Sequence, residues 1–282
     1  MKKRHLSYIQ IIAMGFFLII LTGAILLSLP VASRTDTATP FIDSLFTAAS
    51  ATCVTGLVVY DTYSHWSLFG QLVILFLIQI GGLGFMSMAT LISMLLRRKI
   101  GLRERELMRE AINSLYLGGI VRLTRHIIMG TMLCEGIGAL LLSIRFCPEM
   151  GLGRGIYYGV FHSISAFCNA GFDLMGRFGE FSSLTRYSVD ILVNVVIMSL
   201  IVIGGIGFFV WEDIYNHKLS FRNYQLHTKI VLTTTAALII VSALLFFLME
   251  RSGALKEMNT LQAIVASFFH SVTPRTAGFN TL

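Results

Sequence analysis

Three short loops carry the residues that could do chemistry in this chain. Residues 46–57, 161–172 and 271–279 each combine small side chains with a glycine close to the end of the loop. These glycines are Gly56, Gly171 and Gly278. Each loop lies beside long apolar segments, so non-helical backbone is placed at the depth of a membrane. Such backbone is tolerated there only where protein buries it or where it lines a water-filled cavity.

The chemistry that suits these loops is coordination of a partly dehydrated cation by backbone carbonyl oxygens. Glycine adopts positive φ at little steric cost, so it lets neighbouring carbonyls turn toward one axis. Rings of such oxygens replace the hydration shell of an ion. One loop alone would be interpreted as a turn that ends a helix, whereas three copies favour an ion pathway. The predicted ion-binding residues are Cys53, Val54, Thr55 and Gly56, then Cys168, Asn169, Ala170 and Gly171, then Arg275, Thr276, Ala277 and Gly278.

The composition indicates an all-α polytopic membrane protein. Hydrophobic residues make up 55% of the 282 residues and charged residues only 13%, which is too little charge for the surface of a soluble domain. Apolar runs of about 20 residues can cross a bilayer as helices. We expect five spanning helices, at residues 9–29, 68–96, 127–146, 187–210 and 230–249. Shorter re-entrant half-helices should precede the loops, at residues 43–52, 155–167 and 259–273.

An internal repeat predicts helix–pore-loop–helix units around a pseudo-fourfold ion pore. Residues 23–28 match residues 138–143, an offset of 115 that also separates Gly56 from Gly171. The helix after each loop repeats as well, because residues 80–85 match residues 203–208, an offset of 123. The expected organisation is a first repeat at 1–96, a cytoplasmic link at 97–126, a second repeat at 127–215, a cytoplasmic link at 216–229 and a third repeat at 230–282. We expect this third repeat to be truncated after its loop, so that about two and a half units are present.

The distribution of Lys and Arg predicts the orientation. Residues 1–4, 97–125 and 217–229 contain 14 of the 22 basic residues, and most of the acids lie in the other connections. By the positive-inside rule, the amino terminus and both basic links are cytoplasmic. The glycine loops would then enter the membrane from outside. The net charge of +7 does not indicate nucleic acid, because the basic residues lie where membrane topology requires them.

Three carboxylates near the loops each have two interpretations. Glu135 lies within a predicted span, where an ionisable residue marks a functional site by default, but we favour a buried hydrogen bond between helices. Asp61 and Asp173 follow their loops. Each would either raise the cation concentration at an outer mouth or be a solvated loop acid. His162 and His270 lie in or beside the half-helices and should cap or pack there.

Residues 52–57, 166–172 and 273–280 resemble the pore loops of the Trk/Ktr/HKT potassium transporter superfamily, and most closely those of the bacterial Ktr-type membrane (ion-translocating) subunit. The resemblance covers essentially the whole chain. It implies potassium uptake across the bacterial cytoplasmic (inner) membrane through a glycine-containing, carbonyl-lined selectivity filter. It also implies a homodimer bound by a ring of cytoplasmic nucleotide-binding regulatory subunits. K+ would be the transported ion, Na+ is a coupling or activating ion in some members, and no cofactor is expected in this chain.

The alternative function is a non-conducting membrane sensor or scaffold with a pore-like fold. Loss of a loop glycine would favour it, and all three glycines are present. An enzyme is not expected, since the sequence shows no nucleophile, acid pair or Cys/His ligand spacing. Residues 97–106 mix both signs of charge, which suits either anionic membrane lipid or a cytoplasmic protein partner. The sequence leaves these two partners open.

Charge reversal at Arg103, Arg105 and Arg109 distinguishes a protein partner from membrane lipid. We expect the triple variant of the full-length protein to lose co-purification with its regulatory subunit, because complementary charges fix such contacts. Its expression in the membrane should not fall. Unchanged co-purification would assign these residues to lipid headgroups.

Overall fold

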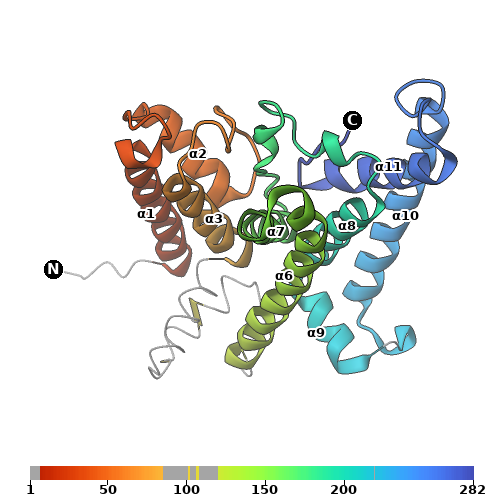
Figure 1. The fold of residues 1–282 in the computed structure, drawn as a ribbon. Coiled ribbons are helices and arrows are strands. Elements are labelled where there is room, and N and C mark those ends of the chain that lie inside the picture. Colours follow the sequence, from red (N-terminus) through yellow and green to blue (C-terminus); the bar gives the residue numbers. More distant parts are fainter. Residues whose placement is uncertain (1–6, 85–100, 102–105, 108–119, 219) are drawn as a thin grey trace. The chain divides into compact units, whose positions relative to one another are not determined.

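A computed structural model describes residues 7–84, 101, 106–107, 120–218 and 220–282 of the chain (Figure 1). These residues form helices and connecting segments, and the one β-bridge among them joins Ser33 and Trp66. Most of the predicted link at 97–126 and the end of the predicted helix at 68–96 lie outside the described residues. The chain divides into two compact units. One contains Met1–Val54 and Trp66–Met132, and the other contains Thr55–His65 and Leu133–Leu282.

Long apolar helices form at three of the five predicted positions. Within the described residues, three helices are long and apolar enough to cross a membrane, namely α1 (Tyr8–Ser28), α6 (Ile120–Met150) and α10 (Leu226–Glu250). The Ser7 side chain begins α1 with a capping box, which satisfies backbone donors that a helix leaves free at its start. The apolar helix α3 (Leu68–Leu83) ends at Gly84, which has φ 80 and ψ 139, so the prediction of one continuous helix at 68–96 is wrong.

The prediction of one continuous helix at 187–210 is wrong. The segment forms α8 (Ile191–Gly205), breaks, and continues as α9 (Phe208–His217) at an angle of 93°. At the break, Gly207 has φ +91 and ψ 147. This conformation is open to glycine but not to residues with a Cβ atom, and it cannot continue a right-handed helix. The hydrophobic run continues through the break, so hydropathy alone could not reveal it.

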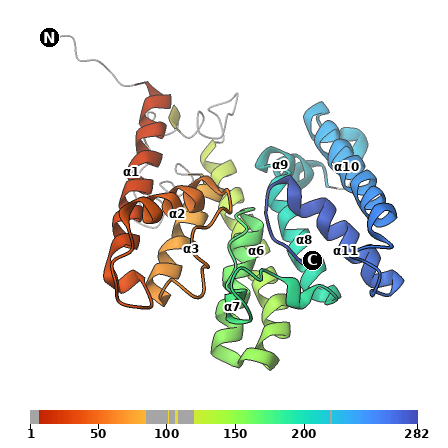
Figure 2. The same cartoon turned by 90° about the horizontal axis from the view of Figure 1, so that it is seen from above.

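Short helices form at the three positions predicted for half-helices. They are α2 (Phe41–Cys53), α7 (Leu152–Phe167) and α11 (Thr260–Val272), the last followed by the 3₁₀ turn η5 (Thr273–Arg275). Their 13 to 16 residues give lengths of about 20–24 Å, less than the thickness of a hydrocarbon core. Each ends directly before its glycine loop. In the second unit α8 packs against α7 and α11, and α11 also packs against α10 (Figure 2).

The same helix contact occurs once in each unit. A Cβ atom added to Gly23 of α1 would lie 2.7 Å from Leu77 Cδ1 of α3. A Cβ atom added to Gly138 of α6 would lie 2.8 Å from Leu200 Cδ1 of α8. The glycines are 115 residues apart and the leucines 123, which are the two offsets of the sequence repeat. Glycine therefore allows the first long helix to pack closely on the helix after the loop in both units.

A second shared contact joins each half-helix to the helix after the loop. A Cβ atom on Gly81 would lie 2.1 Å from the carbonyl oxygen of Thr52, and one on Gly204 would lie 1.9 Å from that of Phe167. Both distances are far shorter than any van der Waals contact, so only glycine fits. The carbonyl ends of α2 and α7 are thereby held against α3 and α8.

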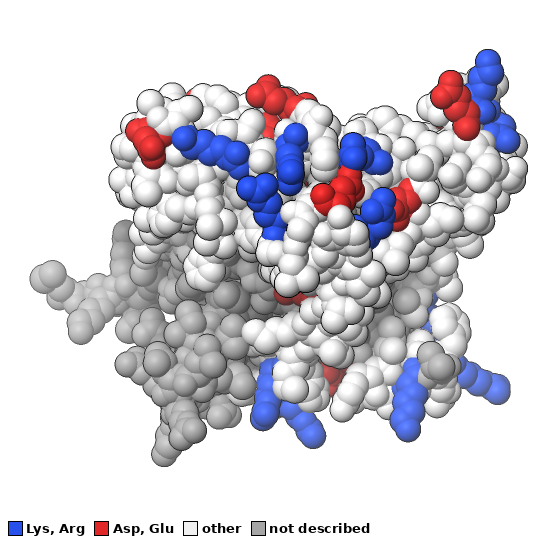
Figure 3. All heavy atoms as spheres, viewed as in Figure 1, with Lys and Arg blue, Asp and Glu red and all other residues white. Residues whose placement is uncertain are grey.

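Charge is unevenly distributed over the second unit. Basic side chains project at the end where α9 and α10 meet, and both signs gather at the opposite end of α10 (Figure 3). The α9–α10 connection contains Lys218, Arg222 and Lys229. This pattern is the one that the positive-inside rule associates with a cytoplasmic face.

Single cysteines test the orientation. We expect an impermeant thiol reagent to label Thr37→Cys but not Asn216→Cys in intact cells that produce the full-length protein without its native cysteines. Both side chains are exposed, and the basic residues place the α9–α10 end inside. Permeabilised cells are the control and should show labelling of both variants. Labelling of Asn216→Cys in intact cells would reverse the orientation.

Candidate functional site

The three loop glycines share one backbone conformation. Their φ angles are +74 at Gly56, +73 at Gly171 and +73 at Gly278. All three belong to the second unit, because that unit includes Thr55–His65 as well as Leu133–Leu282. The positive φ predicted for these glycines is confirmed, and a side chain at any of them would strain the backbone.

Two of these glycines also face a carbonyl oxygen of another loop. A Cβ atom on Gly56 would lie 2.6 Å from the oxygen of Ala170, and one on Gly171 would lie 2.0 Å from the oxygen of Ala277. The three loops therefore contact one another in chain order, backbone against backbone. At Gly278, no described atom lies within 4 Å of the added Cβ position. Positions 56 and 171 therefore require glycine for two reasons, which are the positive φ and the close approach of a carbonyl oxygen from another loop.

The residue two positions before each glycine differs between the loops. Val54 and Asn169 are left-handed, with φ 58 and φ 60, whereas Thr276 has φ −158. Asparagine tolerates this region, but a β-branched valine there is a genuine outlier. Backbone strain of this kind concentrates at functional sites. Cys53, next to Val54, is exposed, and its counterpart Cys168 is buried.

Hydroxyl groups at the ends of two half-helices hold the backbone beyond the glycine. Ser165 Oγ donates to the carbonyl oxygen of Phe172 at 2.6 Å, and Thr273 Oγ1 donates to that of Phe279 at 2.7 Å. Each bond closes its loop into a rigid turn around the glycine. Neither residue was among the predicted site residues. Aligning the loops on their glycines would not have paired them, because Ser165 precedes its glycine by six residues and Thr273 by five.

One side-chain hydrogen bond joins the second and third loops. Thr276 Oγ1 donates to Asn169 Oδ1 at 2.8 Å. Both residues are predicted filter residues, and the bond between their side chains fixes the second loop against the third. Sequence could not show this bond, because 107 residues separate its partners.

The two histidines pack against the loops, as predicted. His162 is fully buried, lies 2.8 Å from the carbonyl oxygen of Tyr158 through Nδ1, and accepts from the Leu174 N–H through Nε2 at 3.3 Å. This pattern corresponds to a neutral ring with its proton on Nδ1. His270 Nε2 lies 3.1 Å from Thr281 Oγ1. Both rings thus stabilise the segment that follows a loop glycine.

Glu135 lies behind the second loop. Its backbone oxygen accepts from Ser163 Oγ at 2.7 Å, and its carboxylate oxygen Oε1 lies 3.9 Å from Cys168 Sγ, which can donate. A buried hydrogen bond between α6 and α7, the favoured interpretation, is present, but the Glu135 backbone oxygen makes it and the carboxylate contacts Cys168 instead. The contact is made with a predicted filter residue, so Glu135 supports the loop from behind.

The three glycines line one cavity of about 190 Å³, with Asp61 and Asp173 also in its wall. Asp61 is buried, and its carboxylate accepts backbone N–H bonds from Tyr63 and Ser64 at 3.0 and 2.7 Å and from Phe181 at 3.0 Å. The interpretation of Asp61 as a solvated loop acid is therefore wrong. It ties the segment after the first loop to the segment after the second.

Asp173 is the other acid of this cavity. Burial and, to a smaller extent, the charge of Asp61 raise the pKa of Asp173 to about 6, although the Met175 N–H and the Ser183 hydroxyl oppose this shift. The Met175 N–H donates to Asp173 Oδ1 at 2.9 Å. A carboxyl group with this pKa is mostly ionised at neutral pH and becomes neutral in mild acid.

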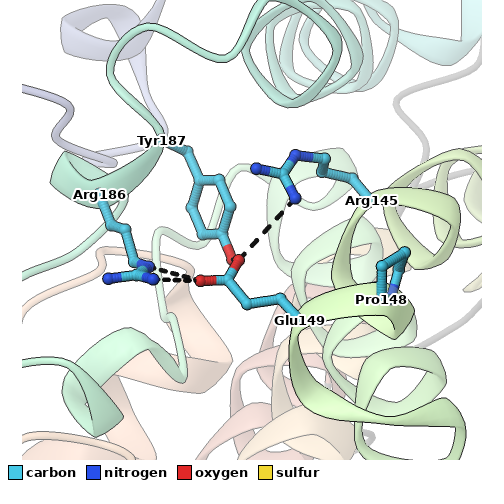
Figure 4. Close-up of a pocket in the computed structure, with 5 residues that line it drawn as sticks. All are labelled: Arg145, Pro148, Glu149, Arg186 and Tyr187. Carbon is cyan, nitrogen blue, oxygen red and sulfur yellow. Dashed lines mark hydrogen bonds and ion pairs between the residues drawn. The ribbon is translucent and has the colours of Figure 1, made fainter.

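A second cavity of about 420 Å³ has paired charges in its wall (Figure 4). Arg186 Nε donates to Glu149 at 2.7 Å, and the hydroxyl group of Tyr187 donates to the same carboxylate at 2.8 Å. Arg145 pairs with Glu149 at 3.9 Å and with Asp190. Because both arginines already bind carboxylates, this cluster joins the end of α6 to the start of α8 and supports the fold rather than a ligand.

Apolar membrane-length helices, interrupted by short helices that end in contacting glycine loops, define a polytopic helical membrane protein. The TrkH family, described as a cation transport protein, matches residues 3–282, and the chain belongs to this family.

Relatives and a solved structure agree with this assignment. The chain is 47% identical over 275 residues to the Ktr system potassium uptake protein B of Bacillus subtilis (strain 168), covering 97% of this chain and 60% of that protein. It is 42% identical over 286 residues to the potassium/sodium uptake protein NtpJ of Enterococcus hirae, covering 100% and 62%. The chain thus spans about three-fifths of the length of these relatives. Its fold is similar to the crystal structure of the potassium transporter TrkH from Vibrio parahaemolyticus, with a TM-score of 0.70, 14% identity, and coverage of 100% of this chain and 53% of that chain.

Replacing Asp173 with asparagine should change how stability depends on pH. The carboxyl pKa is about 6 in the folded protein and 3.8 when unperturbed, so the unfolded chain releases this proton first. Stability from this group is therefore greatest below about pH 4 and is lost as pH rises to about 6. The melting temperature of the full-length protein in detergent should fall across this window more steeply for the native protein than for Asp173→Asn. Glu180→Gln, at an exposed acid of the same connection, is the control, and equal slopes for the native protein and Asp173→Asn would contradict the assignment.

Proposed function

We propose that this chain is the ion-translocating part of a potassium uptake system and that its three glycine loops form a carbonyl-lined selectivity filter. One observation carries the proposal. Gly56, Gly171 and Gly278 share one φ and line one cavity, and loop carbonyls lie against two of them. The names of the two relatives, a potassium uptake protein and a potassium/sodium uptake protein, support the choice of ion.

The filter would work by replacing water with backbone oxygens. A cation enters the cavity beside Asp61 and Asp173, whose negative field raises its local concentration. The carbonyl groups of Thr55, Ala170 and Ala277 and of their neighbours then take the place of lost water. The half-helices end at the loops, so the partial negative charge of their carboxyl ends adds to the attraction. The filter set is the one expected from sequence, Cys53–Gly56, Cys168–Gly171 and Arg275–Gly278.

The surrounding organisation follows from the same proposal. The chain would contribute repeated helix–pore-loop–helix units around a pseudo-fourfold pore, and the helix contacts shared at offsets of 115 and 123 support two such units. The basic links would face the cytoplasm of a bacterium and dock a ring of nucleotide-binding regulatory subunits, and the membrane protein would be a homodimer. Na+ would act as a coupling or activating ion.

Replacing Gly171 with serine tests the filter directly. The variant places a Cβ atom at a positive φ, which costs about 1–2 kcal/mol in the left-handed region, and pushes it against the Ala277 oxygen. Displaced carbonyls should lower discrimination between K+ and Na+ by roughly tenfold. The measurement is rubidium uptake with sodium competition by the full-length protein, in a strain that lacks other potassium uptake.

Gly153→Ser is the matched control. Gly153 is exposed in the first turn of α7, its φ is not positive, and nothing lies within 4 Å of an added Cβ atom. This variant should behave like the native protein. The filter assignment fails if Gly171→Ser reaches the membrane in normal amount and keeps native discrimination. Absence of uptake by the native full-length protein would favour the sensor or scaffold alternative.

A further inference from the structure

We propose that Trp211 is a positioning residue for the second filter loop, which it connects to the bend between α8 and α9. The proposal rests on the filter role of that loop. Trp211 lies in the first turn of α9, on the far side of Gly207 from α8. It contacts both the end of α8 and the end of α7.

The first contact satisfies a backbone group that the bend exposes. A helix leaves the carbonyl groups of its last turn without partners in the helix, and within a membrane the protein itself must supply partners. The indole Nε1–H of Trp211 donates to the carbonyl oxygen of Ile203 at 2.9 Å. Ile203 lies in the last turn of α8. Trp211 therefore folds back over the bend and caps the helix that precedes it.

The second contact reaches the filter loop. The rings of Trp211 and Phe167 lie edge to face, with centroids 5.6 Å apart and an interplanar angle of 69°, which is a preferred aromatic geometry. Phe167 is the last residue of α7, is 3% exposed, and precedes Cys168 of the filter. Its carbonyl oxygen is the atom that lies against Gly204.

These contacts surround one point in the fold. Gly204 of α8 contacts the Phe167 backbone. Trp211 contacts the Phe167 ring and donates a hydrogen bond to the carbonyl oxygen of Ile203, which precedes Gly204 in α8. The Asn169 amide lies on the same side, 3.3 Å from a Cβ atom added to Gly204. Trp211 thus fixes where α7 ends, and so where the backbone of the second loop begins.

The opposite end of α9 is attached to α10. Asp213 is buried, its Oδ2 accepts from the Gln225 N–H at 2.9 Å, and its Oδ1 lies 2.9 Å from His217 Nδ1. Gln225 is the residue that begins α10. With only 10 residues, α9 is a short rigid connection between the start of α10 and the end of α7. A displacement at the α9–α10 connection would reach the second loop through Trp211.

The first repeat has a different residue at the position of Trp211. At the offset of 123 that relates residues 80–85 to 203–208, the residue that corresponds to Trp211 is Met88, which lies outside the described residues. Methionine has no N–H group that could cap a carbonyl. The first loop therefore has no indole at this position of the repeat.

Two variants, Trp211→Leu and Trp211→Phe, test whether the aromatic contact with Phe167 positions the second loop. In the full-length protein, Trp211→Leu should lower discrimination between rubidium and sodium about three- to tenfold, because the edge-to-face contact with Phe167 is lost. Trp211→Phe keeps a ring edge and should restore discrimination to within about twofold. Phe209→Leu, at an exposed position of the same helix, is the control and should match the native protein.

Phe167→Leu removes the same contact from the other partner. It should lower discrimination by a similar factor, and the double variant with Trp211→Leu should be no worse than either single variant, since the two residues act through one contact. This pair keeps the proposal testable even where one variant is poorly produced.

The outcomes separate the two proposals. Native discrimination in Trp211→Leu and Phe167→Leu, with only the maximal rate or the amount of protein reduced, would overturn the positioning role. If Gly171→Ser loses discrimination in the same experiment, the filter assignment stands without Trp211. If neither Gly171→Ser nor Trp211→Leu changes discrimination, the filter assignment itself fails.

Discussion

The structure depends on one constraint, which is that backbone polar groups at membrane depth must find partners other than lipid. Helices satisfy it internally, but the backbone of each glycine loop must find its partners outside a helix. The protein meets the constraint in two ways. The hydroxyl groups of Ser165 and Thr273 bind carbonyls of the loops, and the indole of Trp211 binds a carbonyl in the last turn of α8. In the proposed filter, other loop carbonyls would bind a cation.

Close approach by glycine makes this division possible. Gly81 and Gly204 let the helix after each loop touch a carbonyl in the last turn of the half-helix, so the loop starts from a fixed point. Gly84 and Gly207, which are again 123 residues apart, both have a positive φ; Gly84 caps α3, and Gly207 lies at the break between α8 and α9. The same few glycines therefore set where a helix packs, where it ends and where a loop can turn, and a methyl group at these positions would disturb several of these features at once.

Much of this could be read from sequence, because helix positions and glycine geometry are local properties. The half-helices lie close to their predicted ranges, and the three loop glycines have the expected φ. The bend at Gly207 was missed because apolar residues continue on both sides of it. The carbonyl contacts of Ala170 and Ala277 with other loops, and the burial of Asp61, arise between segments far apart in the chain. No local pattern encodes such contacts, so only the fold reveals them.

The three loops are not copies of one another, and the differences have a physical meaning. Their glycines agree in φ to within a degree, whereas the backbone two residues earlier is left-handed at Asn169 and has φ −158 and ψ −28 at Thr276. A side-chain hydrogen bond nevertheless joins these two residues. Geometry is thus shared where carbonyls would meet an ion and is free to vary where the loops meet the protein. A filter built from unequal loops of one chain can therefore be adjusted from one side, which a filter built from identical subunits cannot.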